Sequence, residues 1–447
     1  MADPIRIGLL GFGNIGAGVA RNLHAHRDTI LQRVERPLEL IRIADIDTAT
    51  PRDVGGFDYS RVLTNDAAAV VEGSDIDIVI ELIGGYEPAR SLVERALKAG
   101  KHVVTANKAM LARHGAALME TAREHGVALL FEASVGGGIP IIRVLQQGLA
   151  ANRITAIYGI LNGTTNYILT RMAGMGLSFA AALAEAQEKG YAEPDPRFDI
   201  EGLDTAHKTA ILAWLAFGRA PQGDEVHAEG IARIAPEDLI FAADNGYAIK
   251  LLGIARRASA PTALAASTVS TSSTPDEGPA GAIELRAHPS LVRSSNILAA
   301  VSGVFNGVMV EGDPIGRTMF YGRGAGPDAT SSAVLSDVIA LADAIASGGL
   351  ARESRLLNAA MQTRERPAVL PMDRLEGSYY LRSGKGASRG NDLIKELKKA
   401  GVEVQILKTE ENGVVQVLTQ RVREGVLVDA LKELKDDPPL MIRTLED

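Results

Sequence analysis

The sequence contains no cysteine among its 447 residues, which excludes disulfide bonds and every mechanism that needs a thiol nucleophile. Its eight histidines are scattered and show no metal-ligand spacing such as H-E-x-x-H. The longest apolar stretch, residues 209–217, is too short to span a bilayer. A strand-like stretch begins within a few residues of Met1, so no signal peptide is expected. These absences favour a soluble, cytoplasmic protein with no membrane partner.

The chain also lacks an excess of positive charge. Its formal net charge is −8 at pH 7, which argues against nucleic acid as a main partner. Hydrophobic residues make up 46% of the chain, and this is enough for substantial cores. The length predicts two or three domains.

The first strand and the turn after it are the most informative stretch. Alternating apolar residues over 5–10 are typical of a buried strand. The G-x-G-x-x-G spacing follows: its first glycine permits a tight turn, its second lets a pyrophosphate approach, and its third lets the next helix pack closely. That helix would offer free N–H groups to the anion. We predict a dinucleotide site, rather than a glycine turn without ligand, at Gly11, Phe12, Gly13, Asn14, Ile15 and Gly16.

Strands and helices alternate up to residue 131, which predicts a parallel, right-handed, doubly wound α/β domain. The second strand, 38–44, ends at Asp45, whose carboxylate could accept the ribose hydroxyls of NAD and repel the extra phosphate of NADP. No arginine stands beside Asp45, since Arg52 comes later and past a proline, so NAD is favoured over NADP. The alternative is that Asp45 is a loop carboxylate with no ligand, since Asp47 and the loop around it are also plausible solvent-facing acids. Further cofactor contacts are expected where later strands end, at Gly84, Thr105 and Lys108.

A glycine-rich stretch, residues 132–140, leads into a second region. One carboxylate, Glu132, stands there beside several accessible backbone carbonyls. Such oxygen atoms could bind a hard cation. The alternative is a flexible hinge or a tightly packed turn.

A dense group of acids follows Gly190. Asp204 and Lys208 lie four residues apart on one predicted helix face. They form either a surface ion pair worth about 0.3–0.5 kcal/mol or a carboxylate that orients a catalytic ammonium. Upstream, the turn 162–166 presents hydroxyls and amides or only caps the next helix. The group of acids consists of Glu193, Asp195, Asp199, Glu201 and Asp204.

The remainder of the chain contains a linker and a terminal unit. Residues 258–282, rich in small and polar side chains, are predicted to form a mobile linker. The glycine turn 322–326 precedes a helix over 329–346, and is either another anion or cofactor contact or a tight turn only. Beyond Gly349, a strand–helix–strand–strand–helix pattern predicts a small, separate α+β sandwich, whose role could be only packing or dimerisation.

In this order, the motifs resemble those of homoserine dehydrogenases over nearly the whole chain. The matching stretches are 8–16 (GLLGFGNIG), 105–109 (TANKA), 131–140 (FEASVGGGIP), 161–167 (LNGTTNY), 190–208, 301–306 (VSGVFN) and 321–326 (YGRGAG). The resemblance implies a reversible, NAD(P)-dependent conversion between L-homoserine and L-aspartate 4-semialdehyde in threonine and methionine biosynthesis. The alternatives are another oxidoreductase with a different acid/base group, and a dinucleotide sensor without activity.

The resemblance also implies roles for individual residues. Lys208 would be the acid/base group, held by Asp204, and Lys108 would lie between nicotinamide and substrate. Glu193 would bind the substrate's amino group. Asp199 and Thr164 are further candidates for substrate contacts.

The resemblance adds a metal site and cofactor contacts. Gly190 and Gly326 would touch the cofactor. A sodium ion would be held by one carboxylate and three carbonyls, those of Glu132, Val135, Gly137 and Ile139.

The domains expected on this basis are a dinucleotide-binding domain over 1–131, completed by about 305–345, a substrate-binding and dimerisation domain over 132–304, and an ACT-like regulatory domain over 350–447. The first loop of the last domain, 383–388, lacks the Arg-Pro-Gly signature of ACT modules. It is therefore expected either to bind an amino acid such as threonine or only to mediate association. The family suggests a homodimer or homotetramer.

Overall fold

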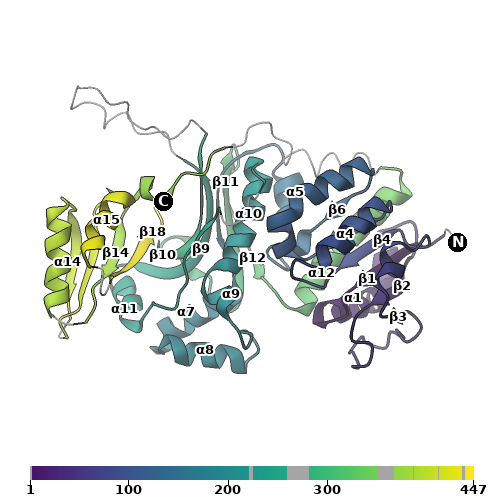
Figure 1. The fold of residues 1–447 in the computed structure, drawn as a ribbon, viewed down its shortest axis with the longest axis horizontal. Helices are drawn as coiled ribbons and strands as arrows, with labels where there is room; N and C mark the ends of the chain where they lie inside the picture. The colour runs from purple at the N-terminus through teal and green to yellow at the C-terminus, as the bar shows by residue number, and fades with distance from the viewer. Residues whose placement is uncertain are drawn as a thin grey trace. The chain divides into compact units, whose positions relative to one another are not determined.

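The structure, a computed structural model, describes residues 3–220, 225–258, 281–349, 367–385, 387–410, 412–434 and 438–446. The chain divides into two units (Figure 1). Unit 1 comprises Met1–Ile154, Ala210–Asp224 and Glu311–Arg366, and unit 2 comprises Thr155–Thr209, Glu225–Val310 and Pro367–Asp447. Most of the predicted linker, residues 259–280, lies outside the described part of the chain.

A parallel six-stranded sheet forms the centre of unit 1. Its strand order is β3-β2-β1-β4-β5-β6, and all neighbours are parallel. The chain therefore starts in the middle and runs outward in both directions, as in doubly wound folds. This order confirms the predicted α/β class. The strands are β1 (Ile5–Leu10), β2 (Leu38–Ala44), β3 (Leu63–Thr64), β4 (Ile78–Glu81), β5 (His102–Thr105) and β6 (Leu129–Leu130).

Helices alternate with these strands because each parallel connection needs a crossover. The four residues of β4 are all buried, as expected for a parallel strand covered on both faces. The helices and the remaining strand of unit 1 are α1 (Asn14–Ala25), α2 (Arg27–Leu31), α3 (Ala67–Val71), α4 (Ala89–Lys98), α5 (Lys108–Glu124), α6 (Ile141–Arg143), α12 (Pro327–Ala346) and β12 (Gly316–Arg323).

Helix α12 corresponds to the helix predicted over 329–346, and its aspartates and serines interrupt any continuous apolar stretch. It is nevertheless the one helix in the described part of the chain that is long and apolar enough to cross a membrane. Val334, Val338 and Leu341 of α12 are fully buried in the same core as Ile7 of β1 and Val19 of α1. More than half of the apolar stretch is buried, so α12 is a core helix of unit 1.

A mixed sheet forms the centre of unit 2, in the order β11-β7-β9-β10-β18-β14-β16-β15, with β8 beside β10. Strands β9 and β10 form the longest pair. They are antiparallel, with Tyr247 opposite Arg293 at one end and Arg257 opposite Ile283 at the other. The first strands are β7 (Arg153–Ile160), β8 (His227–Ala228), β9 (Tyr247–Arg257), β10 (Ile283–Arg293) and β11 (Phe305–Asp313). The helices that accompany them are α7 (Gly163–Met175), α8 (Phe179–Glu188), α9 (Arg197–Ile200), α11 (Pro236–Asp244) and the part of α10 (Leu203–Phe217) up to Thr209, since Ala210 onward belongs to unit 1.

The C-terminal strands continue this sheet, whereas the sequence predicted a separate sandwich. Strand β18 pairs in parallel with β10, at Ser290 with Arg443 and Leu291 with Thr444. Local patterns do not specify which distant strand will be a neighbour, and β18, directly after two prolines, was not predicted. The C-terminal elements are β14 (Tyr379–Arg382), α14 (Ala387–Lys399), β15 (Val404–Thr409), β16 (Val415–Thr419), α15 (Glu424–Leu431) and β18 (Leu440–Thr444).

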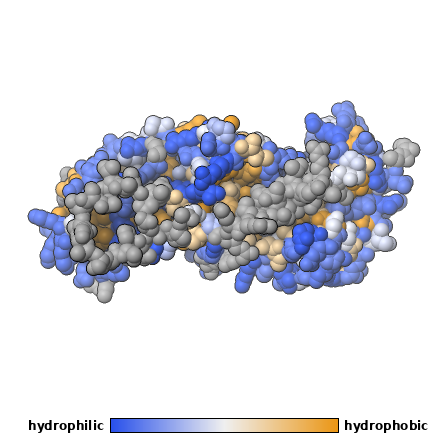
Figure 2. Space-filling model, turned by 90° about the horizontal axis from the view of Figure 1, so that it is seen from above, coloured by the Kyte–Doolittle hydropathy of each residue, from blue (hydrophilic) through white to orange (hydrophobic). Residues whose placement is uncertain are grey.

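Hydrophilic residues cover most of the described surface on the face seen in Figure 2, with apolar residues gathered in smaller areas. Two large apolar side chains are exposed in β15, Val404 at 38% and Leu407 at 53% of their accessible surface. This strand ends the sheet of unit 2. An exposed edge of this kind can pair with another chain.

Gly253 allows helix α10 to lie close to strand β9. A Cβ at this position would come within 2.1 Å of the hydroxyl of Thr209 and 3.2 Å of a methyl group of Thr205. The Thr209 hydroxyl cannot easily move away, because it donates to the Thr205 carbonyl at 2.7 Å and its side chain is β-branched. The absence of a side chain in the middle of β9 therefore sets the position of the first turns of α10.

We expect Gly253→Ala to destabilise the protein by about 1–3 kcal/mol, the usual range for overpacking a close-packed core. Urea unfolding followed by far-UV circular dichroism would measure this loss. Gly174→Ala is the matched control, because no atom lies within 4 Å of its Cβ position. Since Gly174 lies in α7, alanine should raise stability there by up to about 1 kcal/mol. Equal stabilities of Gly253→Ala and the wild type would contradict the packing argument.

Candidate active site

The turn between β1 and α1 has the shape that a dinucleotide pyrophosphate requires. Gly11 has φ +89°, and a Cβ there would lie 2.7 Å from the backbone of Leu82. A Cβ on Gly16 would lie 2.2 Å from the carbonyl oxygen of Gly11. A Cβ on Gly13, by contrast, would meet no atom within 4 Å beyond the adjoining residues of the chain. The turn is thus closed toward the sheet and the helix, and open where the phosphates would lie.

Asp45 lies against this turn. One of its carboxylate oxygens accepts a hydrogen bond from the backbone N–H of Phe12, and the other accepts from the N–H of Asp47 at 2.8 Å. Both carboxylate oxygens of Asp45 are thus bonded to backbone amides, one of the glycine turn and one of its own loop. Asn14 and Ile15 form the first turn of α1, with their backbone amides at the helix N-terminus.

Arg52 has no described contact with Asp45 itself, but it lies close to the glycine turn and pairs with the carboxylate of Asp47 at 3.3 Å. The guanidinium of Arg52 donates to the carbonyl of Phe12 at 3.0 Å and to the carbonyl of Asp47 at 2.9 Å. Arg52 and Asp45 thus share two neighbouring residues. Proximity of this kind, across 40 residues of chain, is not visible in the sequence.

Glu81, which the sequence analysis did not single out, joins two of the predicted cofactor contacts. This buried carboxylate accepts from the hydroxyl of Thr105 at 2.6 Å and from the N–H of Gly84 at 3.2 Å. The side chain of Thr105 is thereby committed to holding the ends of β4 and β5 together. Lys108 begins helix α5, which is capped by the side chain of Asn107. Gly326 precedes helix α12 with φ +110°.

Glu132 is a buried carboxylate held by backbone donors. Its two oxygens accept from the N–H groups of Ile142 at 2.9 Å and Arg143 at 2.8 Å. Burial raises the pKa of Glu132 to about 7, and the nearby charge of Asp337 adds to the rise. Val135 and Ile139, whose carbonyls were predicted as ligands along with that of Gly137, are buried in the same stretch.

The donors in this stretch are oxygen atoms only, which suits a hard cation such as sodium. A bound cation would also favour the ionised form of a carboxylate whose pKa burial raises. The described residues contain no cluster of three or more histidine and carboxylate side chains that could hold a metal. The residues over 132–139 therefore fit an alkali cation better than a transition metal.

In unit 2, Asp204 and Lys208 form a buried ion pair, not a surface pair. The ammonium nitrogen of Lys208 lies 2.8 Å from Asp204 Oδ2, and the two side chains are 10% and 3% exposed. The same nitrogen donates to the carbonyl of Leu161 at 2.7 Å. An ammonium has three N–H bonds, so among the described contacts one remains available for a substrate oxygen.

Asn162 connects this pair to another predicted residue, Asp199. Its amide nitrogen lies 2.8 Å from Asp204 Oδ2 and 2.7 Å from Asp199 Oδ1. Asn162 also caps helix α7. Since its amide bonds to both acids as well, the turn does more than cap this helix. We had not predicted Asn162 as a site residue, although the polar motif that contains it was the available signal.

The turn after α8 carries the other predicted substrate and cofactor contacts of unit 2. The hydroxyl of Thr164 donates to the carbonyl of Tyr191 at 2.6 Å, which fixes the turn against the start of α7. Gly190 is exposed in this turn with φ +70°. The side chain of Glu193 is exposed, and only its backbone carbonyl has a described partner, Gln187 at 3.1 Å.

The five acids thus divide into different environments. Asp199 and Asp204 share Asn162, whereas Asp195 forms an exposed ion pair with Arg197 at 2.6 Å. That pairing holds the pKa of Asp195 near 2. Glu201 is exposed.

A second buried lysine was also not predicted. Lys250 of β9 donates to the carbonyl of Val301, and its nitrogen lies 3.5 Å from Asn166 Oδ1. Burial lowers its pKa to about 8. Because these described partners are uncharged oxygens, Lys250 lacks the carboxylate that accompanies Lys208.

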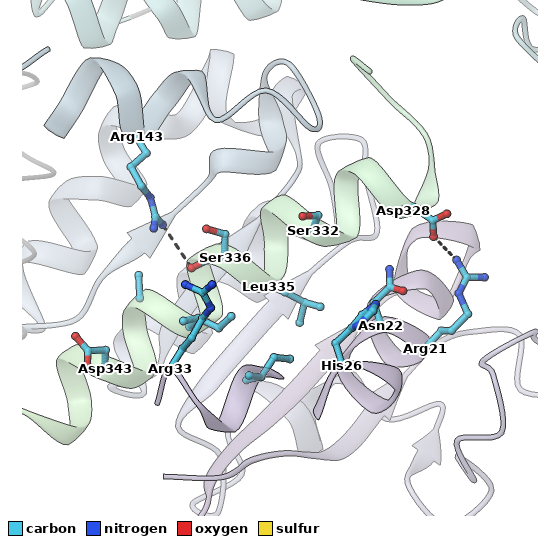
Figure 3. Close-up of a pocket in the computed structure, with 13 residues that line it drawn as sticks. Arg21, Asn22, His26, Arg33, Arg143, Asp328, Ser332, Leu335, Ser336 and Asp343 are labelled. Carbon is cyan, nitrogen blue, oxygen red and sulfur yellow. Dashed lines mark hydrogen bonds and ion pairs between the residues drawn. The ribbon is translucent and has the colours of Figure 1, made fainter. Parts of the chain in front are cut away.

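Unit 1 also has an open groove of about 1070 Å³ between α1, α2 and α12 (Figure 3). Figure 3 shows Arg21 bonded to Asp328 at one end of this groove and Arg143 bonded to the carbonyl of Ser336 farther along. Its lining includes the arginines Arg21, Arg33 and Arg143 and the acids Asp328 and Asp343. The residues that line it include none of the predicted site residues, so the groove is distinct from the site described above.

Comparisons with known proteins identify the family of this chain. A family model described as homoserine dehydrogenase matches residues 140–339, and one described as the NAD-binding domain of homoserine dehydrogenase matches residues 11–132. A homoserine dehydrogenase of Pseudomonas aeruginosa is 39% identical over 97% of this chain and 95% of its own length.

Solved structures are similar as well. A homoserine dehydrogenase from Thiobacillus denitrificans covers 99% of both chains, with a TM-score of 0.88 and 37% identity. A hyperthermophilic archaeal homoserine dehydrogenase in complex with NADPH covers 75% of this chain and 97% of its own, with a TM-score of 0.59 and 26% identity. The chain therefore belongs to the homoserine dehydrogenase family.

Proposed function

We propose that this protein catalyses the reversible, NAD(P)-dependent reduction of L-aspartate 4-semialdehyde to L-homoserine, in the biosynthesis of threonine, methionine and isoleucine. The observation that carries the proposal is the buried Lys208–Asp204 pair, whose ammonium keeps an N–H for a ligand. It lies in a chain that also has an open glycine turn for a dinucleotide. Family membership identifies the substrate.

The chemistry fits these residues. The bound nicotinamide supplies the hydride to the aldehyde carbon, or accepts it in the reverse direction. The aldehyde oxygen gains negative charge in the transition state, and the ammonium of Lys208 stabilises it and donates a proton. In the reverse direction, the neutral amine accepts the proton of the homoserine hydroxyl. Asp204 and the carbonyl of Leu161 hold the nitrogen in place for both steps.

The substrate is an amino acid, so its charged groups need partners. We propose Glu193 and Asp199 for its ammonium group, with the hydroxyl of Thr164 as a further contact. Lys108, at the start of α5, would lie between nicotinamide and substrate. The exposure of Glu193 supports this assignment, because its carboxylate is accessible to a ligand.

We expect Lys208→Ala to lower kcat by about 10²–10⁴-fold, the usual contribution of a positioned acid/base group. Steady-state oxidation of homoserine with NAD(P), followed at 340 nm, would measure this. The control is Lys98→Ala, which removes the lysine of an exposed i,i+4 pair with Glu94 and should leave kcat unchanged. If Lys208→Ala kept most of its activity, another oxidoreductase chemistry would be favoured. If the wild type bound cofactor but did not turn over, a sensor would be favoured.

For the cofactor, we propose that both NAD and NADP bind at the turn 11–16 and that NAD is preferred. The carboxylate of Asp45 supports this preference, because it lies at the end of β2, where it can accept ribose hydroxyls and repel a 2′-phosphate. Arg52 offers a positive charge beside the same turn, and the NADPH complex of an archaeal relative supports NADP as the second cofactor. Gly84, Thr105, Gly190 and Gly326 complete the proposed contacts.

We expect kcat/KM to be higher with NADH than with NADPH, and Asp45→Asn to reduce this preference at least about tenfold, the equivalent of one hydrogen bond to a charged group. Asparagine keeps an acceptor for the N–H of Phe12, so the turn should persist. Asp53→Asn is the control, since its side chain is 88% exposed. A wild type that prefers NADPH would contradict our assignment of Asp45 and favour Arg52 as a phosphate contact.

We also propose a sodium site formed by Glu132 and the carbonyls of Val135, Gly137 and Ile139. The oxygen-only donor set and the burial of Glu132 support it. This site would hold the stretch 132–139 in one conformation rather than act in proton transfer.

Sodium should stabilise the protein more at pH 8 than at pH 5. The pKa of Glu132 in the folded protein, about 7, lies above its usual 4.5. Without sodium, folded Glu132 binds a proton that the unfolded chain releases. The stabilisation that comes from the raised pKa of Glu132 is therefore fully present below about pH 4.5 and is lost as the pH rises through 7. Sodium binds the ionised carboxylate, so it should offset this decline.

Melting temperatures in sodium chloride and choline chloride at both pH values would test this expectation. Glu132→Gln should remove both the sodium effect and the decline, because glutamine does not titrate. Identical melting temperatures in the two salts at pH 8 would exclude the site.

We further propose that the protein is a homodimer or homotetramer and acts in the cytoplasm. The exposed apolar side chains of the edge strand β15 support association. For residues 367–446 we propose an ACT-like role, with threonine as the amino-acid effector or association as the only function.

A further inference from the structure

Asn162 uses every hydrogen-bonding group of its side chain within the site. Its oxygen accepts from the N–H of Thr165 at 2.8 Å and from the hydroxyl of Thr165 at 2.9 Å. Its nitrogen faces Asp199 at 2.7 Å and Asp204 at 2.8 Å. The side chain is 95% buried, with 5% of its surface exposed.

These contacts determine which way the amide points. The Thr165 N–H can only donate, so the atom of Asn162 that it meets must be the oxygen. The NH₂ group therefore faces the two acids, and its two hydrogens match two carboxylate oxygens. Each carboxylate receives one hydrogen bond from the same nitrogen.

The shared amide donor affects how readily the two carboxyl groups ionise. Two neighbouring carboxylates repel each other, and burial disfavours their ionised forms. Hydrogen bonds to the charged form act in the opposite direction. Lys208, on the same helix as Asp204, and Asp199, on α9, are the titratable groups hydrogen-bonded to Asp204 or to this amide. His207 of α10, the neighbour of Lys208, also packs its ring against Phe198 of α9, next to Asp199. Strand β9 contributes Gly253, against Thr205 and Thr209 of α10.

Asn162 also stands next to Leu161, whose carbonyl binds the ammonium of Lys208. Two consecutive residues at the end of β7 thus hold both members of the ion pair. Leu161 fixes the lysine through its backbone, and Asn162 fixes the aspartate through its side chain. The position of the ammonium is therefore set by a strand end and not by α10 alone.

We propose that Asn162 is a positioning residue for the reaction: its amide keeps Asp199 and Asp204 ionised side by side and holds Asp204 in the orientation that aims Lys208 at the substrate oxygen. The inference rests on the proposed dehydrogenase activity. It does not require Asn162 to touch the substrate.

The test is Asn162→Ser, which keeps an oxygen to cap α7 but removes the shared amide donor. We expect kcat for homoserine oxidation to fall about 10–100-fold, the equivalent of one hydrogen bond to a charged group. The acidic limb of the kcat–pH profile should move to higher pH by about one unit, since Asp204 loses a donor to its ionised form. The KM for NAD(P) should not change.

The control is Ser178→Ala, which removes the N-cap of α8, also in unit 2. It should lower the melting temperature without moving the pH profile. If Asn162→Ser does not fold, Asn162→Asp keeps the cap and the volume but replaces the donor with a third carboxyl group. Its kcat should fall further than 100-fold at pH 9, where all three acids are ionised.

The outcomes separate this inference from the proposed function. An inactive wild type would overturn the proposed function. An active wild type, together with a variant whose kcat lies within twofold and whose pH profile superimposes, would overturn the role of Asn162. A variant that loses only thermal stability would overturn it as well, since a helix cap alone would explain that result.

Discussion

An ammonium group that is almost fully buried needs both an opposite charge and hydrogen-bond acceptors, and this requirement organises unit 2 around Lys208. Breaking a buried ion pair by removing one partner costs about 3–5 kcal/mol. The acceptors come from different elements: Asp204 lies one turn earlier in α10, and Leu161 follows β7. Strand β9 leaves room for α10 through Gly253. The geometry of the ammonium is therefore determined by the core of the unit and not by a surface loop.

Buried polar groups in unit 1 are also hydrogen-bonded within the protein, so the groups at the strand ends have partners before a ligand binds. Glu81 is buried, yet it is bonded to a hydroxyl from β5 and to two backbone amides of the following loop. Asp45 is bonded to two backbone amides as well. A site prepared in this way needs little rearrangement when it binds, which reduces the entropic cost of association.

Much of this could be predicted from the sequence, because it depends on short-range patterns. The parallel sheet of unit 1 follows from alternating strands and helices, and the open turn follows from three glycines at fixed spacing. The spacing of Asp204 and Lys208 placed them on one helix face. It could not distinguish an exposed pair from a buried one, since burial depends on what packs against the helix.

The features that sequence reasoning missed are contacts between distant segments. Arg52 reaches the glycine turn through the carbonyl of Phe12, and Asn162 meets Asp204 across 42 residues. The pairing of β18 with β10 is likewise a contact between distant segments. A local pattern predicts that a strand exists, but which strand pairs with it depends on the packing of the whole unit.

The placement of β18 has a consequence for how the protein is made. This strand consists of Leu440–Thr444, far along the chain from β10 (Ile283–Arg293), yet it lies between β10 and β14 in the sheet of unit 2. Synthesis runs from the N-terminus, so the β1–β6 sheet can assemble while translation continues. The sheet of unit 2 cannot close until residues 440–444 have left the ribosome. Until then Ser290 and Leu291 of β10 lack their partners in β18, although β8 already pairs with β10 at Arg286 and Ala287.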